Sequence, residues 1–196
     1  MSSNDKKLKV KDLVLIGIFT VIYFVVMYGV GMMGMVPILF LIYPTVLGIV
    51  TGPILMLFMA KVQKPFSLFI LGILSPLLMF IMGHTYILLV HSILIMVIAE
   101  LIRRAGKYNS FKHNMFSFGV FNAWICGSLM QILFVRERYM EMTTTMMGEE
   151  YASGLERLVT YPNMALVYLG AIVGGIIGAL LGKLLLRKHF EKAGIV

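Results

Sequence analysis

The sequence predicts an all-α integral membrane protein, a bundle of six transmembrane helices with both termini in the cytoplasm. Four long stretches carry no Asp, Glu, Lys or Arg: 13–60, 65–99, 115–135 and 158–182. A bilayer core about 30 Å thick is crossed by roughly 20 apolar residues in a helix, so the first two stretches each hold two spans. Because the chain has 196 residues, little is left for a soluble domain, and we expect a single membrane domain over 1–196.

The positions of the basic residues predict the orientation of this bundle. Fourteen of the 17 Lys and Arg residues fall in four segments, 6–11, 61–64, 103–112 and 183–192, which share one side of a six-span protein. Cytoplasmic loops carry an excess of Lys and Arg, so these segments and both termini are expected inside. The net charge of +8 is therefore a topology signal, with mild attraction to anionic lipid, and does not indicate nucleic-acid binding.

Breaks in the apolar stretches divide them into spans at about 12–30, 36–60, 65–82, 86–102, 114–135 and 162–183. Asp12 favours the N-terminus of the first span, which is longer than a signal-peptide core and lacks a cleavage site. Pro65 and Pro162 suit the first residue of spans 3 and 6. Thr85, in the Gly-His-Thr break, is of the residue type that caps a helix N-terminus.

The segment 136–161 is the one long loop expected on the outer side. It is polar, carries charges of both signs and contains two glycines. Loops of this length in compact proteins are usually functional lids or disordered. Seven of the 17 methionines lie in this loop or in the turn 32–35. Their thioethers could bind cuprous ions, but adaptable apolar contact is the more common role.

Polar residues inside the spans are few, and intramembrane polar residues are functional suspects by default. Those toward the outer side would form a cup with aromatic walls and a few directional polar groups, as small-molecule sites have. We expect the ligand between spans 4, 5 and 6, covered by 136–161 and 32–35. The expected binding residues are His84, Tyr86, His91, Trp124, Gln131, Arg138, Tyr161 and Asn163.

Span 5 gives this site its clearest pattern, because Trp124, Ser128, Gln131 and Arg138 fall in one narrow sector of a helix with 3.6 residues per turn. Trp124 would supply flat apolar contact and Gln131 a hydrogen bond. Arg138 would favour a carboxylate or other anion, which a guanidinium binds in a bidentate manner. The glutamates of 136–161 oppose an anion, so a neutral or metal-bearing ligand is the alternative. The alternative for each residue is an interhelical hydrogen bond or an interfacial anchor. Asn122 faces the other way and is expected to join helices.

The last span carries glycines at every fourth position, which places them on one helical face. Small residues at this spacing let another helix backbone approach closely. The pattern predicts tight packing inside the bundle, with a docking surface for a partner subunit as the alternative. The glycines are Gly170, Gly174, Gly178 and Gly182.

Other chemistries find little support in the residues. Gly182-Lys183 is followed by Leu184, which excludes the GxxxxGK phosphate loop. His84 and His91 could bind a metal ion or haem, but no carboxylate accompanies them. Cys126 stands alone, which excludes a disulfide framework.

No metal site and no acid–base or nucleophile set emerges, so we expect no enzyme activity and no cofactor in this chain. The remaining alternatives are an independent transporter or channel, a membrane-embedded enzyme, and a haem or metal uptake protein.

Short motifs spread along nearly the whole chain are shared with one family. They are KKLKVKDL from Lys6, GIFT from Gly17, YFVV from Tyr23, MGH from Met82, GKYNSFK from Gly106, GGIIG from Gly174 and RKHFEKAG from Arg187. In these motifs the chain resembles the substrate-capture (S) components of energy-coupling factor (ECF) transporters, of the ABC class, in the MptD or Trep-Strep group.

The resemblance implies a six-helix bundle in the bacterial plasma membrane that binds a vitamin or related small organic micronutrient from outside with high affinity. Such S components associate with a transmembrane coupling (T) subunit and two cytoplasmic ATPases, which use the ATP. In many relatives an Ala-x-x-x-Ala motif on span 1 contacts the coupling subunit, and here Gly17 and Thr20 occupy that region, with Val21 at the fourth position. The nickel and cobalt relatives have His after the initiator Met, whereas this chain has Ser2.

Overall fold

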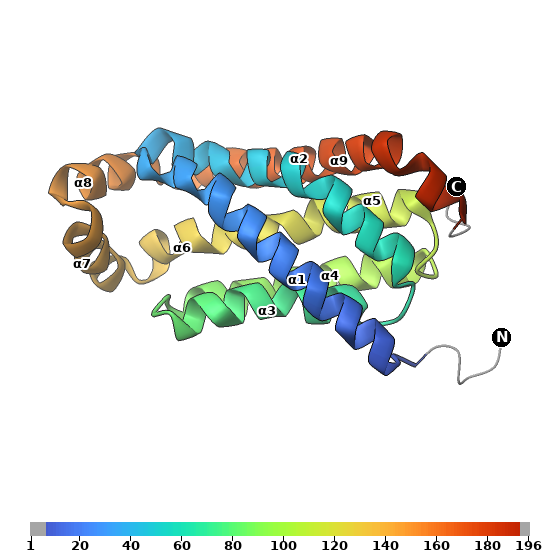
Figure 1. Cartoon of the computed structure of the whole chain (residues 1–196). Coiled ribbons are helices and arrows are strands. Elements are labelled where there is room, and N and C mark those ends of the chain that lie inside the picture. The colour runs from blue at the N-terminus through green and yellow to red at the C-terminus, as the bar shows by residue number, and fades with distance from the viewer. Residues whose placement is uncertain (1–6, 193–196) are drawn as a thin grey trace.

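The computed structural model describes residues 7–192, with side chains as far as Arg187, and all regular structure in that range is helical (Figure 1). The elements, in chain order, are α1 (Val10–Gly31), η2 (Met32–Met35), α2 (Pro37–Lys61), α3 (Ser67–Ile81), α4 (Tyr86–Ala105), α5 (Phe111–Asn122), η3 (Ala123–Cys126), α6 (Gly127–Phe134), α7 (Arg136–Met147), α8 (Glu149–Leu158) and α9 (Tyr161–Lys192).

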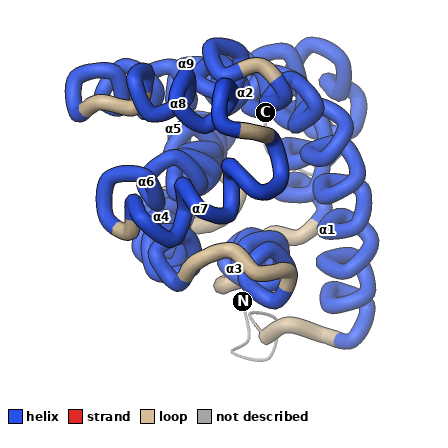
Figure 2. The backbone as a smooth tube through the Cα atoms, turned by 90° about the vertical axis from the view of Figure 1, so that its left-hand side faces the viewer, coloured by secondary structure: helices blue, strands red, loops and turns tan. Residues whose placement is uncertain are grey.

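The long helices run between two ends of an elongated bundle (Figure 1). We call the end where α1 begins and α9 ends the proximal end, and it also holds the loops 62–66 and 106–110. The opposite, distal end holds η2, the loop 82–85 and the helices α7 and α8. In the view of Figure 2, α1 lies on one side of the bundle and α4 on the other, with α3 between them.

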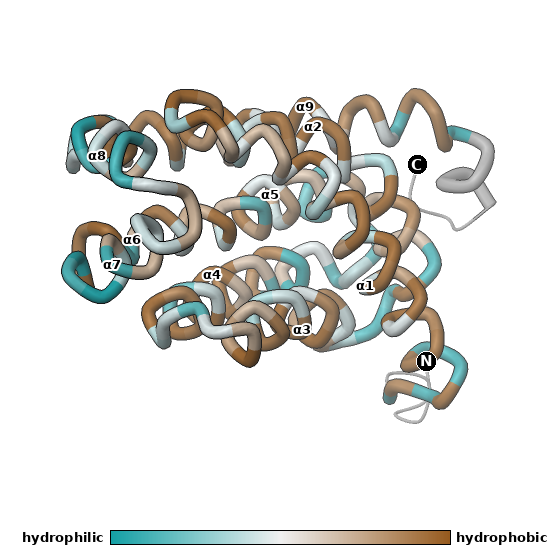
Figure 3. Tube along the Cα trace, turned by 60° about the vertical axis from the view of Figure 1, so that its left-hand side comes forward, coloured by the Kyte–Doolittle hydropathy of each residue, from teal (hydrophilic) through white to brown (hydrophobic). Residues whose placement is uncertain are grey.

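Five helical segments of the described chain are long and apolar enough to cross a membrane: Val10–Met35, Pro37–Lys61, Tyr86–Ala105, Phe111–Phe134 and Tyr161–Arg187. The helix α3 is a further apolar segment but shorter, with 15 residues. Figure 3 shows hydrophobic residues along these helices and hydrophilic ones gathered on α7 and α8. The predicted class, an all-α integral membrane protein, agrees with these features.

Two predicted span boundaries differ from the structure. Pro65 does not open span 3, because Phe66 adopts a left-handed backbone with φ of 61° and α3 begins only at Ser67. Span 5 is not one continuous α-helix, since the 3-10 turn η3 separates α5 from α6. A 3-10 turn has three residues per turn, so the narrow sector predicted from α-helical spacing is not kept between Trp124 and Arg138.

The segment 136–161 was expected as a loop and is instead a helical hairpin. Its helices α7 and α8 meet at Gly148, whose φ of 88° suits a residue without a side chain. Each helix turns a few side chains inward, among them Tyr139 on α7 and Leu155 on α8. These buried side chains pack the hairpin onto the distal end. The segment 136–161, which was predicted to cover this end, is therefore helical.

The glycine face of α9 packs against α2, as predicted for close helix contact. A Cβ placed on Gly178 would lie 2.1 Å from the Gly48 carbonyl oxygen, and one on Gly174 would lie 2.3 Å from the Thr45 carbonyl oxygen. No larger residue fits there without moving backbone. Asn122 supports this seam, because its amide donates 2.8 Å hydrogen bonds to the carbonyls of Pro44 on α2 and Ala171 on α9.

The proximal end is closed around Arg103, which is fully buried. Its guanidinium donates to Ser67 Oγ at 2.8 Å, to the Val62 and Met59 carbonyls at 2.8 and 3.3 Å, and to Asn114 Oδ1 at 3.2 Å. These partners come from α2, α3 and α5 and the loop after α2, so one side chain ties four segments together. Glu100, three residues before Arg103 on α4, accepts a 2.6 Å hydrogen bond from the Phe66 N–H.

Candidate functional site

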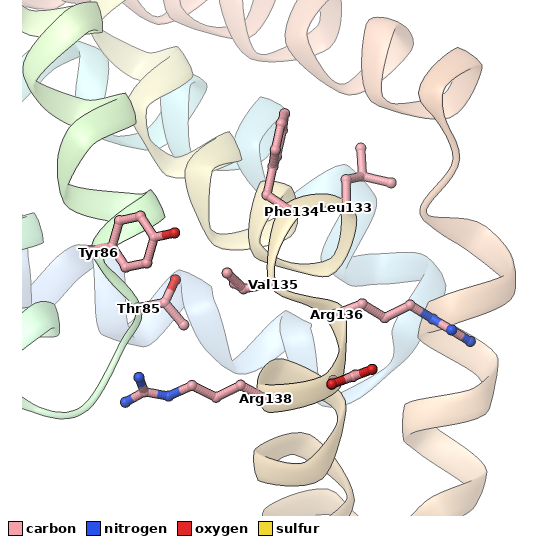
Figure 4. A pocket seen from close by; sticks show the side chains of 8 residues that line it. Thr85, Tyr86, Leu133, Phe134, Val135, Arg136 and Arg138 are labelled. Atoms are coloured by element: carbon pink, nitrogen blue, oxygen red, sulfur yellow. The ribbon is translucent and has the colours of Figure 1, made fainter.

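A cavity of about 470 Å³ opens at the distal end, between the start of α4 and the junction of α6 with α7. This volume is within the usual range for small-molecule sites, roughly 300–1,000 Å³. Apolar and aromatic side chains come from the start of α4 and the end of α6, and charged side chains come from the first turn of α7 (Figure 4). The lining residues are Thr85, Tyr86, Leu133, Phe134, Val135, Arg136, Glu137 and Arg138.

Gln131 fixes the α4 wall of this pocket from behind. It is fully buried on α6, and its Oε1 accepts a 2.9 Å hydrogen bond from the Thr85 N–H. Its Nε2 donates to the Ser128 carbonyl at 3.0 Å, so both ends of the amide are occupied. Gln131 therefore positions Thr85, and since it is fully buried it does not line the pocket itself.

Thr85 is the N-cap residue of α4, as predicted, but it does not cap the helix with its side chain. The residue is 3 % exposed, and its Oγ1 has no hydrogen-bond partner within the described residues. Figure 4 shows the Thr85 hydroxyl and the Tyr86 hydroxyl on the same side of the pocket, facing Val135. A buried hydroxyl without a partner costs about 1–3 kcal/mol, so this group is a candidate ligand contact.

The opposite wall is the first turn of α7, where two arginines lie in different states. Arg136 pairs with Glu156 on α8, which neutralises its charge. Arg138 is exposed and forms no hydrogen bond or ion pair with the described residues. In Figure 4 the Arg138 side chain extends toward the α4 wall, below Thr85. Its guanidinium is thus available to a bound molecule.

The hairpin that carries this wall is fastened to the rest of the distal end. The Tyr151 hydroxyl on α8 donates a hydrogen bond to the Gly34 carbonyl in η2. A Cβ on Gly154 would lie 3.4 Å from the Pro37 side chain at the start of α2, so α8 and α2 are in close contact there. Together with the Arg136–Glu156 pair, these contacts hold α7 at the pocket.

Of the residues predicted to bind a ligand, the structure brings two into this pocket. Tyr86 is 57 % exposed and forms part of the α4 wall, and Arg138 lies on the α7 wall. His84 lies one residue before Thr85 in the same loop, half-buried, and burial lowers the pKa of its imidazole, which is therefore neutral at pH 7. Tyr161 is exposed at the start of α9 and is not among the lining residues.

The other predicted binding residues lie elsewhere and have partners of their own. Trp124 is fully buried in the core, where its indole N–H donates a 2.8 Å hydrogen bond to the Tyr23 hydroxyl. The His91 Nε2 lies 2.5 Å from the Tyr168 hydroxyl, which links α4 to α9. Asn163 donates at 2.7 Å to the Leu158 carbonyl and so joins the end of α8 to α9.

The two residues predicted to contact a coupling subunit point in different directions. Gly17 is exposed, and a Cβ placed on it would have no atom within 4 Å. Thr20 is buried, and its hydroxyl donates a 2.8 Å hydrogen bond to the Ile16 carbonyl within α1. On this face only Gly17 offers a flat place for another helix, with Val14, Ile18 and Val21 exposed around it.

Sequence reasoning missed the apolar wall of the pocket and the role of Thr85. Leu133, Phe134 and Val135 belong to an apolar span, so nothing in their type distinguishes them from lipid-facing residues. Val135 has φ of −136° and ψ of 47°, which breaks the helix between α6 and α7 and turns Phe134 and Arg138 toward one space. The sequence signal that could have identified Thr85 was its place in the short Gly-His-Thr break between two predicted spans.

The polar and aromatic side chains of this pocket can contact a bound molecule. Its lining residues supply hydroxyl, guanidinium, carboxylate and aromatic groups, with no histidine or cysteine among them. Within the described residues, no group of three or more His, Cys, Asp or Glu side chains is placed to hold a metal ion.

Comparison with protein families gives a match over almost the whole described chain. Residues 10–192 match the family described as a hypothetical bacterial integral membrane protein, Trep_Strep. Comparisons with curated proteins and with solved structures gave no match. The matched range runs from the first residue of α1 to the last of α9 and includes the whole distal pocket. The chain belongs to the Trep_Strep family of bacterial integral membrane proteins.

Proposed function

We propose that this protein is the substrate-capture subunit of an ECF-type ABC importer and binds a small organic micronutrient, such as a vitamin, in the distal pocket. The observation that carries the proposal is the distal pocket itself, where neither the buried Thr85 hydroxyl nor the Arg138 guanidinium has a partner among the described residues. Polar groups that have no hydrogen-bond partner at one end of an apolar bundle are suited to bind a molecule that arrives from the water on that side.

The proposed topology has six spans, with the proximal end in the cytoplasm of a bacterial cell and the distal end outside. At 1.5 Å per residue, the α3 helix is about 22 Å long, and the loops at its ends complete the crossing. Within residues 7–187, for which side chains are described, the proximal end carries eleven Lys and Arg residues, and the distal end carries three beside five Glu residues. The positive-inside rule supports this orientation.

Partners are part of the proposal, because the sequence holds no nucleotide-binding loop with which to energise uptake. A transmembrane coupling subunit and two ATPases would supply this function and use the ATP, while this chain has no enzyme activity and no cofactor. The exposed α1 face around Gly17 is the proposed contact with the coupling subunit, since a missing side chain lets a second helix approach closely.

The closed proximal end favours capture over an independent channel. A channel needs a polar path to both faces of the membrane, whereas the fully buried Arg103 donates to four acceptors that close the proximal end. The haem and metal alternatives have less support, because no group of three or more His, Cys, Asp or Glu side chains lies together within the described residues, and the His91 Nε2 contacts the Tyr168 hydroxyl.

The proposal can be tested by a photo-crosslinking amino acid at Gly17, with the same substitution at Leu166 on α9 as the control. Both positions are exposed, and Leu166 lies on another helix. We expect the Gly17 position alone to crosslink to a membrane protein that co-purifies with two ATPases. Proteoliposomes that contain all four subunits should then take up the molecule retained by the purified chain, only with ATP. Solute passage through the chain alone would contradict the proposal.

A further inference from the structure

We infer that the molecule bound in the distal pocket carries an anionic group, a carboxylate or a phosphate, placed between Arg138 and the N-terminus of α4. The inference rests on the proposed function in that it concerns the same pocket. It is carried by three features that converge there: a free guanidinium, a buried hydroxyl without a partner, and the start of a helix.

The α4 wall provides donors for an anion. The first N–H groups of an α-helix have no intrahelical partner, and together with the helix dipole they favour negative charge. Thr85 and Tyr86, the N-cap and first residue of α4, both line the pocket. Because the Thr85 Oγ1 does not cap these groups and is bonded to no other described residue, its hydroxyl is free to donate to the same anion.

The α7 wall provides the charge. Arg138 faces the pocket without an ion pair, whereas Arg136, two residues earlier, is neutralised by Glu156. A guanidinium binds carboxylate and phosphate oxygens through two parallel hydrogen bonds. Arg138 therefore acts on the ligand, and Arg136 acts on the position of the hairpin.

Glu137 lines the same pocket and opposes an anion. It also lies in the first turn of α7, next to Arg138, and makes no ion pair with a described residue. It adds no donor, while the α4 wall and Arg138 supply at least two. We therefore place the anion toward Thr85 and Arg138, and we expect removal of the Glu137 charge to strengthen anion binding.

The rest of the pocket limits what accompanies the anion. Tyr86, Leu133 and Phe134 offer apolar and aromatic surface beside the polar groups. The ligand class that fits is a small organic acid with a flat apolar part. An anion of this chemistry could also be the headgroup of an acidic lipid, because the pocket is open at the end of a membrane bundle.

The test uses 4-fluorobenzoate as the probe and 4-fluorobenzamide as its neutral counterpart. Both are titrated by fluorine NMR against the full chain in phosphatidylcholine nanodiscs, with empty nanodiscs to correct for partition into lipid. The variants are Arg138→Gln, Thr85→Val and Glu137→Gln. Arg157→Gln is the matched control, since Arg157 is an exposed arginine at the same end, on α8, that does not line the pocket.

We expect saturable binding of the acid and at least tenfold weaker binding of the amide, as for loss of one charged hydrogen-bonding group. Arg138→Gln should weaken binding of the acid about tenfold and Thr85→Val by about threefold to tenfold. Glu137→Gln should strengthen it, and Arg157→Gln should leave it unchanged. The inference is overturned if the acid does not bind, or if it binds equally to Arg138→Gln and to Arg157→Gln.

Two further outcomes separate this inference from the proposed function. If the acid and the amide bind equally well and both lose binding in Phe134→Ala, the inference of an anionic group is overturned. The proposal that the pocket captures a small molecule would still hold. Nanodiscs with added phosphatidylglycerol test the lipid source. If that lipid displaces 4-fluorobenzoate from the wild type, the anion is a headgroup, and the small-molecule function proposed for the pocket fails.

Discussion

The two ends of α4 hold buried polar groups in opposite states. At its proximal end Arg103 is fully buried and donates to two side chains and two carbonyls. At its distal start Thr85 is nearly as buried, yet its hydroxyl has no partner within the described residues. Across the pocket from Thr85, Arg138 is exposed and has no ion pair with a described residue.

This difference separates structural polar groups from groups that are available for binding. Both ends contain arginines and hydroxyls, so residue type alone does not distinguish them. What distinguishes them is whether their hydrogen bonds are satisfied inside the protein, because an unsatisfied buried group lowers stability by about 1–3 kcal/mol. Arg103 is satisfied at one end of the bundle, although the Asn114 Nδ2 and the Glu100 Oε2 beside it have no partner within the described residues, whereas the Thr85 hydroxyl is open at the other end, where the cavity lies.

The largest effect is expected at the closed end, for Arg103→Met. The substitution leaves the Ser67 hydroxyl, the Asn114 amide and two carbonyls without their donor in a buried place, which we expect to lower the free energy of unfolding by about 3–5 kcal/mol. Unfolding in detergent measures this loss. Arg104→Met is the control, since Arg104 is exposed and next in sequence. Equal stability of the two variants would show that the proximal network is not structural.

The next effect is expected for Gln131→Leu, behind the open end. The Thr85 N–H and the Ser128 carbonyl both lose a partner, which should lower stability by about 1–3 kcal/mol and displace the α4 wall. Binding of 4-fluorobenzoate should weaken about tenfold, which equals 1.4 kcal/mol.

Asn122→Leu is the matched comparison, because Asn122 also bridges two segments through hydrogen bonds but lies away from the pocket. It should lower stability by a similar amount and leave the affinity of the folded protein unchanged. Equal loss of affinity in both variants would mean that Gln131 has no special relation to the site.

A smaller effect of opposite sign is expected for Thr85→Val. Since the Thr85 hydroxyl has no partner to lose, replacing it with a methyl group should raise stability by about 1 kcal/mol while weakening binding of the probe. Ser75→Ala is the control, because the Ser75 hydroxyl on α3 is also buried without a partner but does not line the pocket. It should gain similar stability with no change in binding. A loss of stability in Thr85→Val would show that the hydroxyl is a structural group.

The smallest effect on stability is expected for Gly17→Trp, outside both ends. Gly17 is exposed and a Cβ there has no atom within 4 Å, so the free energy of unfolding should change by less than about 0.5 kcal/mol. ATP-dependent uptake should nevertheless fail, because the bulky side chain would separate α1 from the coupling subunit, while binding of 4-fluorobenzoate persists. Normal uptake by this variant would place the partner contact on another face.

The sequence predicted the parts of the fold that depend on composition and local spacing. Apolar stretches without charge located the long helices, and the four-residue spacing from Gly170 to Gly182 predicted the seam with α2. The 3-10 turn at 123–126 could not be predicted, since no proline marks it and the residues are as apolar as the helices around them. That turn decides which way Trp124 and Gln131 face.

The candidate site could be predicted only in part, for a related reason. Tyr86 was identified from its place at the outer end of a predicted span, and Arg138 from an α-helical spacing along span 5 that the 3-10 turn does not keep. The hydrogen bond between Gln131 and Thr85 joins residues 46 positions apart, and the partner of Trp124 is Tyr23, 101 positions away. Such pairings depend on how whole helices pack, so no local pattern distinguishes a free polar group from a satisfied one.

The most direct test of the proposed orientation, with the open end outside and the closed end inside, is labelling of single cysteines by a membrane-impermeant maleimide. In a Cys126→Ala background, Phe134→Cys places a thiol in the distal pocket, and Lys61→Cys places one at the exposed end of α2 on the proximal side. We expect the thiol at position 134 to react in intact cells and the one at position 61 to react only after the cells are permeabilised. Reaction at position 61 in intact cells, with position 134 protected, would contradict a distal pocket that captures its ligand from outside.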